Sequence, residues 1–400
     1  MQNSNEYFQY TLAELKKSSD RKLFNVVSFF SGGGGSSCGY KLAGGDMICV
    51  NEFQQVHADT YSANWPNTPV IVDDIKKVTG KTIREQIGDV EIDILDGSPP
   101  CPPFSMSGTK RKGWGKEKMA YGFKQERIED LTFEQVRLVK ELQPKVVICE
   151  NVKGLTMEYA RDYLNMMLKE FEDCGYIMTH KVLNAWEHGV PQKRQRVFMV
   201  GVRNDVADKI GMNWMTIGNI FPEPNNKEKP VIEDAIRDLQ TDPVNIAEAK
   251  KLCESMKKSA KYKWMKRMPK DPNRVVSVGD DVVGPWYDKW IEHRRVRDKV
   301  LPERKSSFFQ SRRVPYNQAS HTLSEQGLMT SLAVHLHPEE DRVYTTYEAI
   351  RIMTLPNDYI QTGELNDRLA RIGLMVAPIC LKNLVEEIYT KVLEPCNQLN

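Results

Sequence analysis

Short apolar runs alternate with helical patterns along the first two hundred residues, and this alternation constrains the fold more than any other feature of the sequence. The first run, Leu23–Phe30, leads into four consecutive glycines at 32–35, as a buried strand does when it meets a tight turn. Strands are predicted at 23–30, 47–51, 70–72, 92–95, 145–149 and 196–202, and helices at 37–42, 53–63, 131–142 and 159–171. The pattern predicts an α/β fold, a parallel sheet with helices on both faces and binding sites beyond the carboxyl ends of its strands.

The sequence changes character after Asn204. Prolines interrupt any periodicity, and residues 250–274 hold ten Lys or Arg against two acids. This bias suits a surface that faces phosphates, although a solvated helix face has the same composition. Regular helical patterns return at 346–353 and 378–393. Four segments are predicted: an N-terminal extension at 1–20, a first domain at 21–204, a smaller second domain at 205–340, and a C-terminal segment at 341–400.

Composition narrows the cellular setting. No apolar stretch approaches the roughly 18 residues that a membrane span needs, and the first twenty residues lack the apolar core of a signal peptide. We therefore expect a cytoplasmic protein without membrane contacts. The eight cysteines form no C-x-x-C pair and no close grouping with histidine, so free thiols and no metal site are expected.

The glycine turn and two carboxylates form a candidate ligand site. Phe30–Gly35 lets backbone approach a ligand with no Cβ in the way, but it lacks the G-x-G-x-x-G spacing of a dinucleotide site. Glu52 ends the second predicted strand, where it can accept both ribose hydroxyls, and Asp74 follows the third, near an adenine amino group. Phe30 and Phe53 can pack against the adenine ring. Singly these residues are better explained as a turn and solvated acids; together they indicate an adenosine-containing ligand.

Cys101 follows the fourth predicted strand. Two prolines precede it and two follow it, which fixes the backbone and aims the thiol in one direction. A lone cysteine is usually a small core residue, but a core strand cannot hold four prolines. A rigidly aimed thiol beside a nucleoside site is a candidate nucleophile.

Further polar residues are predicted at the same sheet edge. Glu150 closes the fifth strand, where its carboxylate would point into the cleft that holds Cys101; a helix-start acid stabilised by the helix dipole is the alternative. The two-residue period of a strand places Gln192, Arg194 and Arg196 on one face. Alone, that pattern is no more than a charged strand edge.

Four motifs in this order resemble those of the DNA cytosine-5 methyltransferases, of the prokaryotic restriction–modification type. The motifs are Phe30–Gly35, Pro99–Cys101, Glu150–Val152 and Gln192–Arg196. The resemblance covers about 24–204 and resumes from near Arg312 to about Leu393. It implies a Rossmann-like S-adenosylmethionine-dependent methyltransferase domain, with 205–340 as a smaller target-recognition domain and 341–400 completing the catalytic domain.

The resemblance also implies where the cofactor S-adenosylmethionine would bind. It would lie across the glycine turn, with Glu52 on its ribose and with Asp74 and Phe53 at its adenine. The implied cofactor-binding residues are Phe30, Gly32, Gly34, Gly35, Glu52, Phe53, Asp74 and Pro100.

The implied reaction takes place on a cytosine that has left the base stack, because carbon 6 is unreachable inside a duplex. Cys101 would attack carbon 6, which makes carbon 5 nucleophilic, and Glu150 would hold or protonate ring nitrogen 3. Arg196, supported by Arg194, would anchor the base edge and the loop. The segment 105–127, rich in glycine and basic residues, fits a loop that closes over the site, although a disordered surface loop has the same composition.

The resemblance makes double-stranded DNA of a specific sequence the expected partner. A cognate restriction endonuclease that acts on the same site is a candidate partner. The enzyme itself is expected to be a monomer. Arg312 or Arg313 with Thr322 and Leu323 resembles the motif that supports the recognition domain. Arg342, Thr345, Glu348 and Arg351 resemble a helix motif of the family.

Two positions depart from the family pattern. Pro102 follows the cysteine where the family has Gln, and Leu374 follows Gly373 where the family has Asn. Three alternatives stay open. A transfer-RNA cytosine-5 methyltransferase would share every catalytic motif, and an inactive DNA-binding paralogue is suggested only by Leu374. A dehydrogenase lacks its glycine spacing here and would leave Cys101 unexplained.

Overall fold

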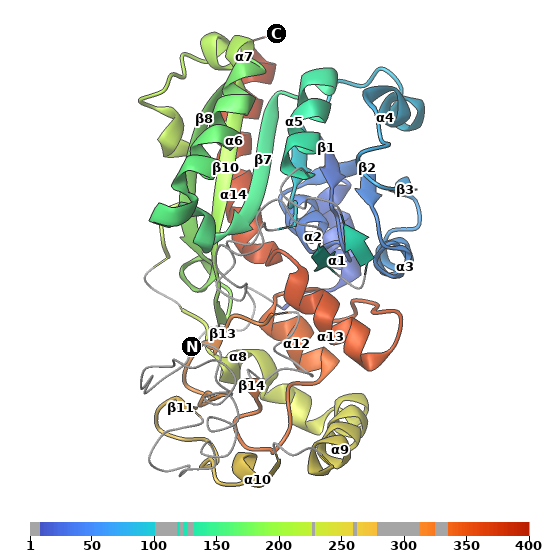
Figure 1. Ribbon diagram of the computed structural model, residues 1–400, viewed down its shortest axis with the longest axis vertical. Coiled ribbons are helices and arrows are strands. Elements are labelled where there is room, and N and C mark those ends of the chain that lie inside the picture. The colour runs from blue at the N-terminus through green and yellow to red at the C-terminus, as the bar shows by residue number, and fades with distance from the viewer. Residues whose placement is uncertain are drawn as a thin grey trace.

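A mixed seven-stranded sheet forms the centre of the computed structural model (Figure 1), which describes residues 9–100, 118–120, 123–125, 131–225, 229–258, 262–277, 312–324 and 335–399. The strand order is β3-β2-β1-β4-β7-β10-β8. The strands are β1 (Phe24–Phe29), β2 (Gly45–Glu52), β3 (Val70–Val72), β4 (Ile94–Gly97), β7 (Val146–Val152), β8 (Tyr176–Asn184) and β10 (Gln195–Arg203).

All six predicted strands overlap a strand of this sheet, but the expectation of a purely parallel sheet was wrong. The pairs from β3 to β7 are parallel, whereas β10 runs antiparallel to both β7 and β8. The chain returns from β8 to β10 after only ten residues, a connection too short for a parallel crossover. Strand β8 was not predicted, because it lies at the sheet edge and the polar His180 and Lys181 interrupt its apolar run.

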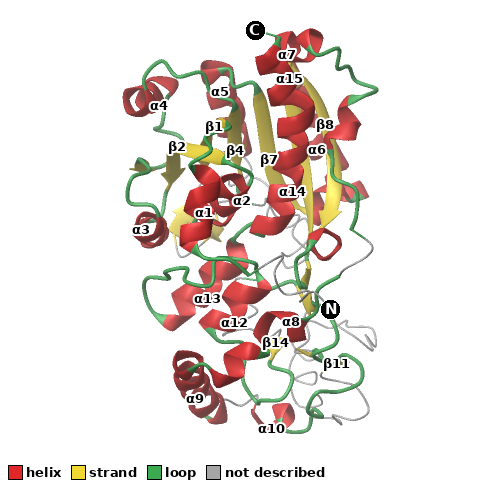
Figure 2. Ribbon diagram, turned by 180° about the vertical axis from the view of Figure 1, so that it is seen from behind, coloured by secondary structure: helices red, strands yellow, loops and turns green. Residues whose placement is uncertain are grey.

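Helices cover both faces of the sheet. On one face lie α4 (Gly80–Ile87), α5 (Leu131–Leu142) and α6 (Arg161–Asp173). On the other, seen in Figure 2, lie α1 (Leu12–Ser19), α2 (Gly35–Leu42) and α14 (Pro378–Ile388). A Cβ at Gly39 of α2 would lie 2.9 Å from the Leu381 Cβ, so the glycine permits close packing of α2 on α14. The C-terminal helix thereby returns to the first half of the chain.

One long helix and several short elements make up the lower part of the molecule in Figure 1. They include α8 (Ile232–Ile236), α9 (Pro243–Lys257), α10 (Tyr262–Met265) and the small sheet of β11 (Val276–Ser277), β12 (Arg312–Arg313) and β14 (His335–Leu336). Two C-terminal helices, α12 (Thr346–Ile352) and α13 (Leu365–Leu374), lie between this part and the main sheet.

The predicted segment boundaries stay predictions. Residues just after Asn204 do not leave the main core, because Val206, Ala207 and Ile217 pack into the same cluster as α2 and α14. Within the part of the chain that the structure describes, no helix has the length and apolarity to span a membrane.

Candidate active site

The glycine turn joins β1 to α2 at the carboxyl edge of the sheet, beside the point where the strand order reverses between β1 and β4. Gly32 and Gly34 have φ values of +55° and +93°, which side chains rarely tolerate. A Cβ on Gly34 would also overlap the Trp65 ring, and one on Gly35 would lie 2.6 Å from the Met375 Cβ. Glycine is therefore required at these positions. It lets the turn pack between the C-terminal segment and Trp65, the residue that follows α3 (Gln55–Asn64).

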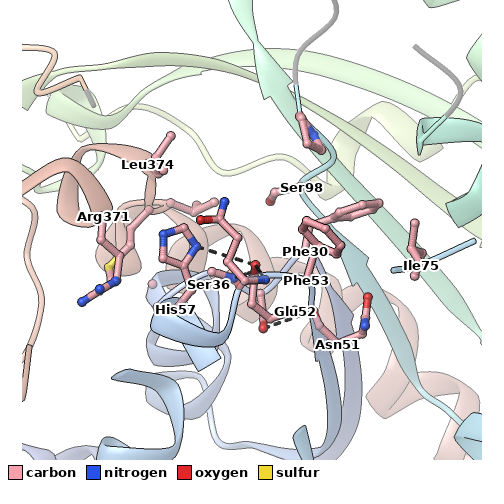
Figure 3. Close-up of a pocket in the computed structure, with 18 of the residues that line it drawn as sticks. Phe30, Ser36, Asn51, Glu52, Phe53, His57, Ile75, Ser98, Arg371 and Leu374 are labelled. Carbon is pink, nitrogen blue, oxygen red and sulfur yellow. Dashed lines mark hydrogen bonds and ion pairs between the residues drawn. The ribbon is translucent and has the colours of Figure 1, made fainter. Parts of the chain in front are cut away.

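An open cavity, about 930 Å³ with its adjoining solvent space included, lies over this turn. Seven of the eight predicted cofactor residues line it: Phe30, Gly32, Gly35, Glu52, Phe53, Asp74 and Pro100. The eighth, Gly34, does not, because it packs against Trp65. In Figure 3, Phe30 and Ile75 border one end of the cavity and Arg371 and Leu374 the other, with Glu52 between them. Its mixed polar and aromatic lining suits a nucleoside ligand.

Glu52 is fixed in the cavity by backbone donors. Its Oε2 accepts from the Gly32 N–H at 2.7 Å and its Oε1 from the Gln54 N–H at 2.8 Å. The His57 Nδ1 lies 3.6 Å from Oε1 (Figure 3). The next side chain, Phe53, is 43% exposed. A held carboxylate beside a partly exposed aromatic side chain suits a ribose and its base.

Several cavity residues were missed by the sequence analysis. They are Ser31, Gly33, Ser36, Asn51, Gln54, His57, Ile75, Ser98, Leu131, Arg371, Met375 and Val376. Leu374, noted above only as a departure from the family pattern, also lines the cavity. The missed residues next to known motifs, such as Ser31 and Gln54, could have been found by proximity in the sequence. His57 and Arg371 carry no such signal.

Arg194 lies apart from the cavity and supports its wall. Its guanidinium donates to the carbonyl oxygens of Leu323 at 2.9 Å, Gly373 at 3.2 Å and Met375 at 2.9 Å. It is buried, and burial lowers its pKa. The side chain thus ties the β10 region to the segment that carries Leu374 and Met375.

Glu150 and Arg196 form an ion pair at the same edge, with 3.0 Å between Oε1 and Nε. They come from the paired strands β7 and β10. The neighbouring Asn151 donates through Nδ2 to the Pro99 carbonyl oxygen at 3.4 Å, which connects β7 to the proline run. Cys101, Pro102 and most of the predicted closing loop lie outside the described residues. The described part therefore brings Glu150 and Arg196 to the edge where Pro99 and Pro100 lead into Cys101.

A buried carboxyl at Asp96, on β4 below the proline run, was not assigned a role from sequence. It is 2% exposed and accepts a hydrogen bond from the Ser28 hydroxyl at 2.8 Å. Burial raises the pKa of Asp96 to about 6, against the opposing effect of the Ser28 hydrogen bond, and the charge of Glu150 adds to the rise.

Comparison with known proteins gives a consistent result. The family model for C-5 cytosine-specific DNA methylases matches residues 24–390. The chain is 30% identical to the Type II methyltransferase M.PspPI of Psychrobacter sp. (strain TA137), over 88% of this chain and 75% of the relative. It is 27% identical to M.DdeI of Desulfomicrobium norvegicum, over 91% and 88% of the two chains. A solved structure of an E. coli DNA modification methyltransferase encoded within a prophage shares the fold. Its TM-score is 0.61 at 21% identity, and the match covers 93% of this chain and 99% of that one.

Proposed function

The chain belongs to the C-5 cytosine-specific DNA methylase family, and from this premise we propose how its site methylates carbon 5 of cytosine in DNA. It is a DNA (cytosine-5)-methyltransferase of the Type II restriction–modification kind. The target is a cytosine flipped out of a specific double-stranded sequence, and the reaction passes through a covalent bond between Cys101 and carbon 6. The observation that carries the proposal is the convergence of Glu52, Pro100 and the Glu150–Arg196 pair on one sheet edge.

The cavity fits the cofactor S-adenosylmethionine, which supplies an electrophilic methyl group on a sulfonium when bound. Glu52 would accept the ribose hydroxyls, and Phe30 and Phe53 would pack on the adenine. Asp74 would accept from the adenine amino group. The support is that these side chains line one cavity.

The protein side chains then divide the chemistry on cytosine. The Cys101 thiolate adds to carbon 6, and the electron pair of the 5,6 double bond becomes available at carbon 5 for the methyl group. Glu150, held by Arg196 at 3.0 Å, donates a proton or a hydrogen bond to ring nitrogen 3, so that charge does not build up on the ring. Loss of the carbon-5 proton to solvent restores the 5,6 double bond, while the bond between carbon 6 and sulfur breaks and Cys101 leaves as a thiolate. A proton taken up at nitrogen 3 returns to Glu150.

Bisulfite sequencing of a plasmid that expresses this protein tests the proposal, because it reads both the modification and the recognised sequence. We expect methylated cytosines at one recurring site, and none with Cys101→Ser. A mark that survives this substitution would refute the covalent mechanism. Bisulfite sequencing of transfer RNA from the same cells is the matched control, and modification confined to RNA would refute DNA as the substrate.

The partners follow from the same proposal. Double-stranded DNA is the substrate, and the basic residues of 250–274 would face its phosphates. A restriction endonuclease that cuts the same unmethylated site would be the cognate partner, and the methyltransferase would act as a monomer.

A further inference from the structure

One arginine at the cavity has donors without acceptors. Arg371, on α13, is 1% exposed, yet its Nε and Nη2 atoms are buried with no hydrogen-bond partner. Its Nη1 atom donates to the Thr60 hydroxyl at 2.6 Å, to the Gln361 side-chain oxygen at 3.1 Å and to the Thr362 carbonyl at 3.0 Å. Among the described residues, no carboxylate lies within 4.0 Å of the guanidinium. One edge of the fork is thus anchored while the other lacks an acceptor.

The free edge has the geometry that binds a carboxylate. Nε–H and one Nη2–H of a guanidinium point in parallel, and a carboxylate accepts both in a two-bond fork. Burial of unpaired donors costs free energy and is rare in folded proteins, so each case calls for a partner. Burial also lowers the pKa of Arg371. An anion placed against this edge would relieve both effects.

Arg371 lies at the end of the cavity that the adenosine part leaves free. Its stem packs on the glycine turn, because a Cβ on Gly33 would lie 2.7 Å from the Arg371 Cδ. Figure 3 shows Arg371 and Leu374 on the side opposite Phe30 and Ile75, with Glu52 between and the Arg371 guanidinium at the outer edge of the group. With the base at Phe30 and the ribose at Glu52, the amino-acid part of the cofactor extends toward Arg371.

The carboxylate is the one anionic group of S-adenosylmethionine. At the wall nearest to it, the family pattern has an amide donor, but this chain has the apolar Leu374. We propose that Arg371 replaces the missing amide and binds the carboxylate of the methionine part through its Nε–Nη2 edge. The inference rests on the proposed cofactor. Both nitrogens are shielded from water by the surrounding side chains, so binding requires one of these side chains to rotate.

Calorimetric titration of two ligands that differ only in the carboxylate tests this assignment without any turnover. The ligands are S-adenosylmethionine and its decarboxylated form, which keeps the adenosine, the sulfonium and the amine. The wild type should bind the carboxylate-bearing ligand more tightly. In Arg371→Met that preference should fall by about 10- to 100-fold, as expected for a lost charge-assisted pair.

Two further variants complete the test. Arg368→Met removes an arginine one turn earlier on α13 that donates to the Gly363 carbonyl oxygen, and it should leave the preference unchanged. Should Arg371→Met fail to fold, Arg371→Gln keeps a donor toward Thr60 and carries the same expected loss. An unchanged preference in either Arg371 variant, with S-adenosylmethionine still bound, overturns the inference alone. A wild type that binds neither ligand overturns the proposed cofactor as well.

Discussion

Two arginines are equally buried in this molecule but differ in their partners. Arg342 and Arg371 are each 1% exposed. Arg342 meets Glu348 through two bonds, Nη1 to Oε2 at 2.7 Å and Nη2 to Oε1 at 2.8 Å. Glu348 also accepts from the Thr345 N–H at 2.9 Å and caps α12. Among the described residues no carboxylate lies within 4.0 Å of Arg371, on which Asp367 and Asp59 act only from farther away, and two of its nitrogens have no hydrogen-bond partner.

The difference separates a structural joint from a binding site. The Arg342–Glu348 pair joins the segment before α12 to its first turn, and Asn245 of α9 contributes a further bond to Glu348 at 3.4 Å. Both Nη atoms of Arg342 are taken up by Glu348, and only its Nε lacks a partner, so no edge with two free nitrogens is left for a ligand. A buried charge with free donors or a raised pKa, by contrast, is typical of a functional site. Burial alone does not distinguish the two regions; the remaining hydrogen-bonding capacity does.

The largest effect is expected from breaking the complete pair. Glu348→Gln leaves the buried Arg342 with only the more exposed Glu340 carboxylate, at 2.8 Å, as a counter-charge. The free energy of unfolding should fall by about 3 kcal/mol in urea titrations at pH 7. The matched control is Arg351→Gln, which removes a pair to the half-exposed Asp238 at 3.2 Å and should cost less than about 1 kcal/mol. Equal losses in the two variants would contradict the contrast drawn here.

The same pair sets an acid limit on stability. Burial alone would raise the pKa of Glu348, but the charge of Arg342 outweighs burial and holds this pKa at about 2. Burial lowers the pKa of the facing His337 to about 4. A carboxyl whose pKa is lowered by folding stabilises the protein above its unfolded pKa of about 4.3. This contribution is lost as pH falls toward 2. The stability gap between wild type and Glu348→Gln should therefore narrow over that range.

Asp96 should give a smaller effect of the opposite sign. Its pKa of about 6 lies some two pKa units above the unfolded value, which corresponds to about 3 kcal/mol. Because folding raises the pKa of Asp96, the contribution of this group to stability is complete below about pH 4 and is lost as the pH rises through about 6. The Asn side chain in Asp96→Asn can still accept the hydrogen bond from Ser28. At pH 8 the free energy of unfolding of this variant should exceed that of the wild type by up to about 3 kcal/mol, and at pH 4 the two should be nearly equal.

The control for Asp96 is the same change at a paired carboxyl. Asp93 accepts from the Lys145 ammonium at 2.8 Å and from the Asn25 N–H at 2.9 Å. Asp93→Asn should therefore destabilise the protein at pH 8. If both variants lose stability at pH 8, Asp96 is an ordinary partnered acid.

Much of the site could be predicted because its residues lie next to strand ends. The alternation of apolar runs located six strands, and parallel strands end at one edge, so Glu52, Asp74 and Glu150 were expected together. Seven of eight predicted cofactor residues line one cavity. What sequence could not reveal depends on contacts between distant segments. Arg371 meets Gly33 and Thr60 only through packing of α13, and no local pattern distinguishes a partnered arginine from an unpartnered one.

The prediction that the last strand runs parallel to its neighbours was wrong for a related reason. Period and apolarity predict that a segment is extended, but the pairing partner depends on the length of the connection and on the neighbouring strand. Arg194 is a further case. The strand period placed Gln192, Arg194 and Arg196 on one face of an extended segment. In the structure Arg194 lies between β9 (Gln192–Lys193) and β10, and Gln192 and Arg194 are buried whereas Arg196 is only partly buried. The period could not indicate that Arg194 would hold the carbonyl oxygens of Gly373 and Met375.

The smallest expected effect is the most direct probe of Arg371. Leu374→Asn restores the amide of the family pattern at a position that is 36% exposed, so stability should change by less than about 0.5 kcal/mol. In the wild-type background, affinity for S-adenosylmethionine should rise only a few-fold, because Arg371 already meets the carboxylate. In the Arg371→Met background the same change should recover more of the lost affinity. Two residues that serve one group give non-additive effects, whereas residues with separate roles give additive ones. Calorimetry measures the affinity of the wild type, the two single variants and the double variant for S-adenosylmethionine. Strict additivity of the two effects would mean that Leu374 and Arg371 do not share a ligand group.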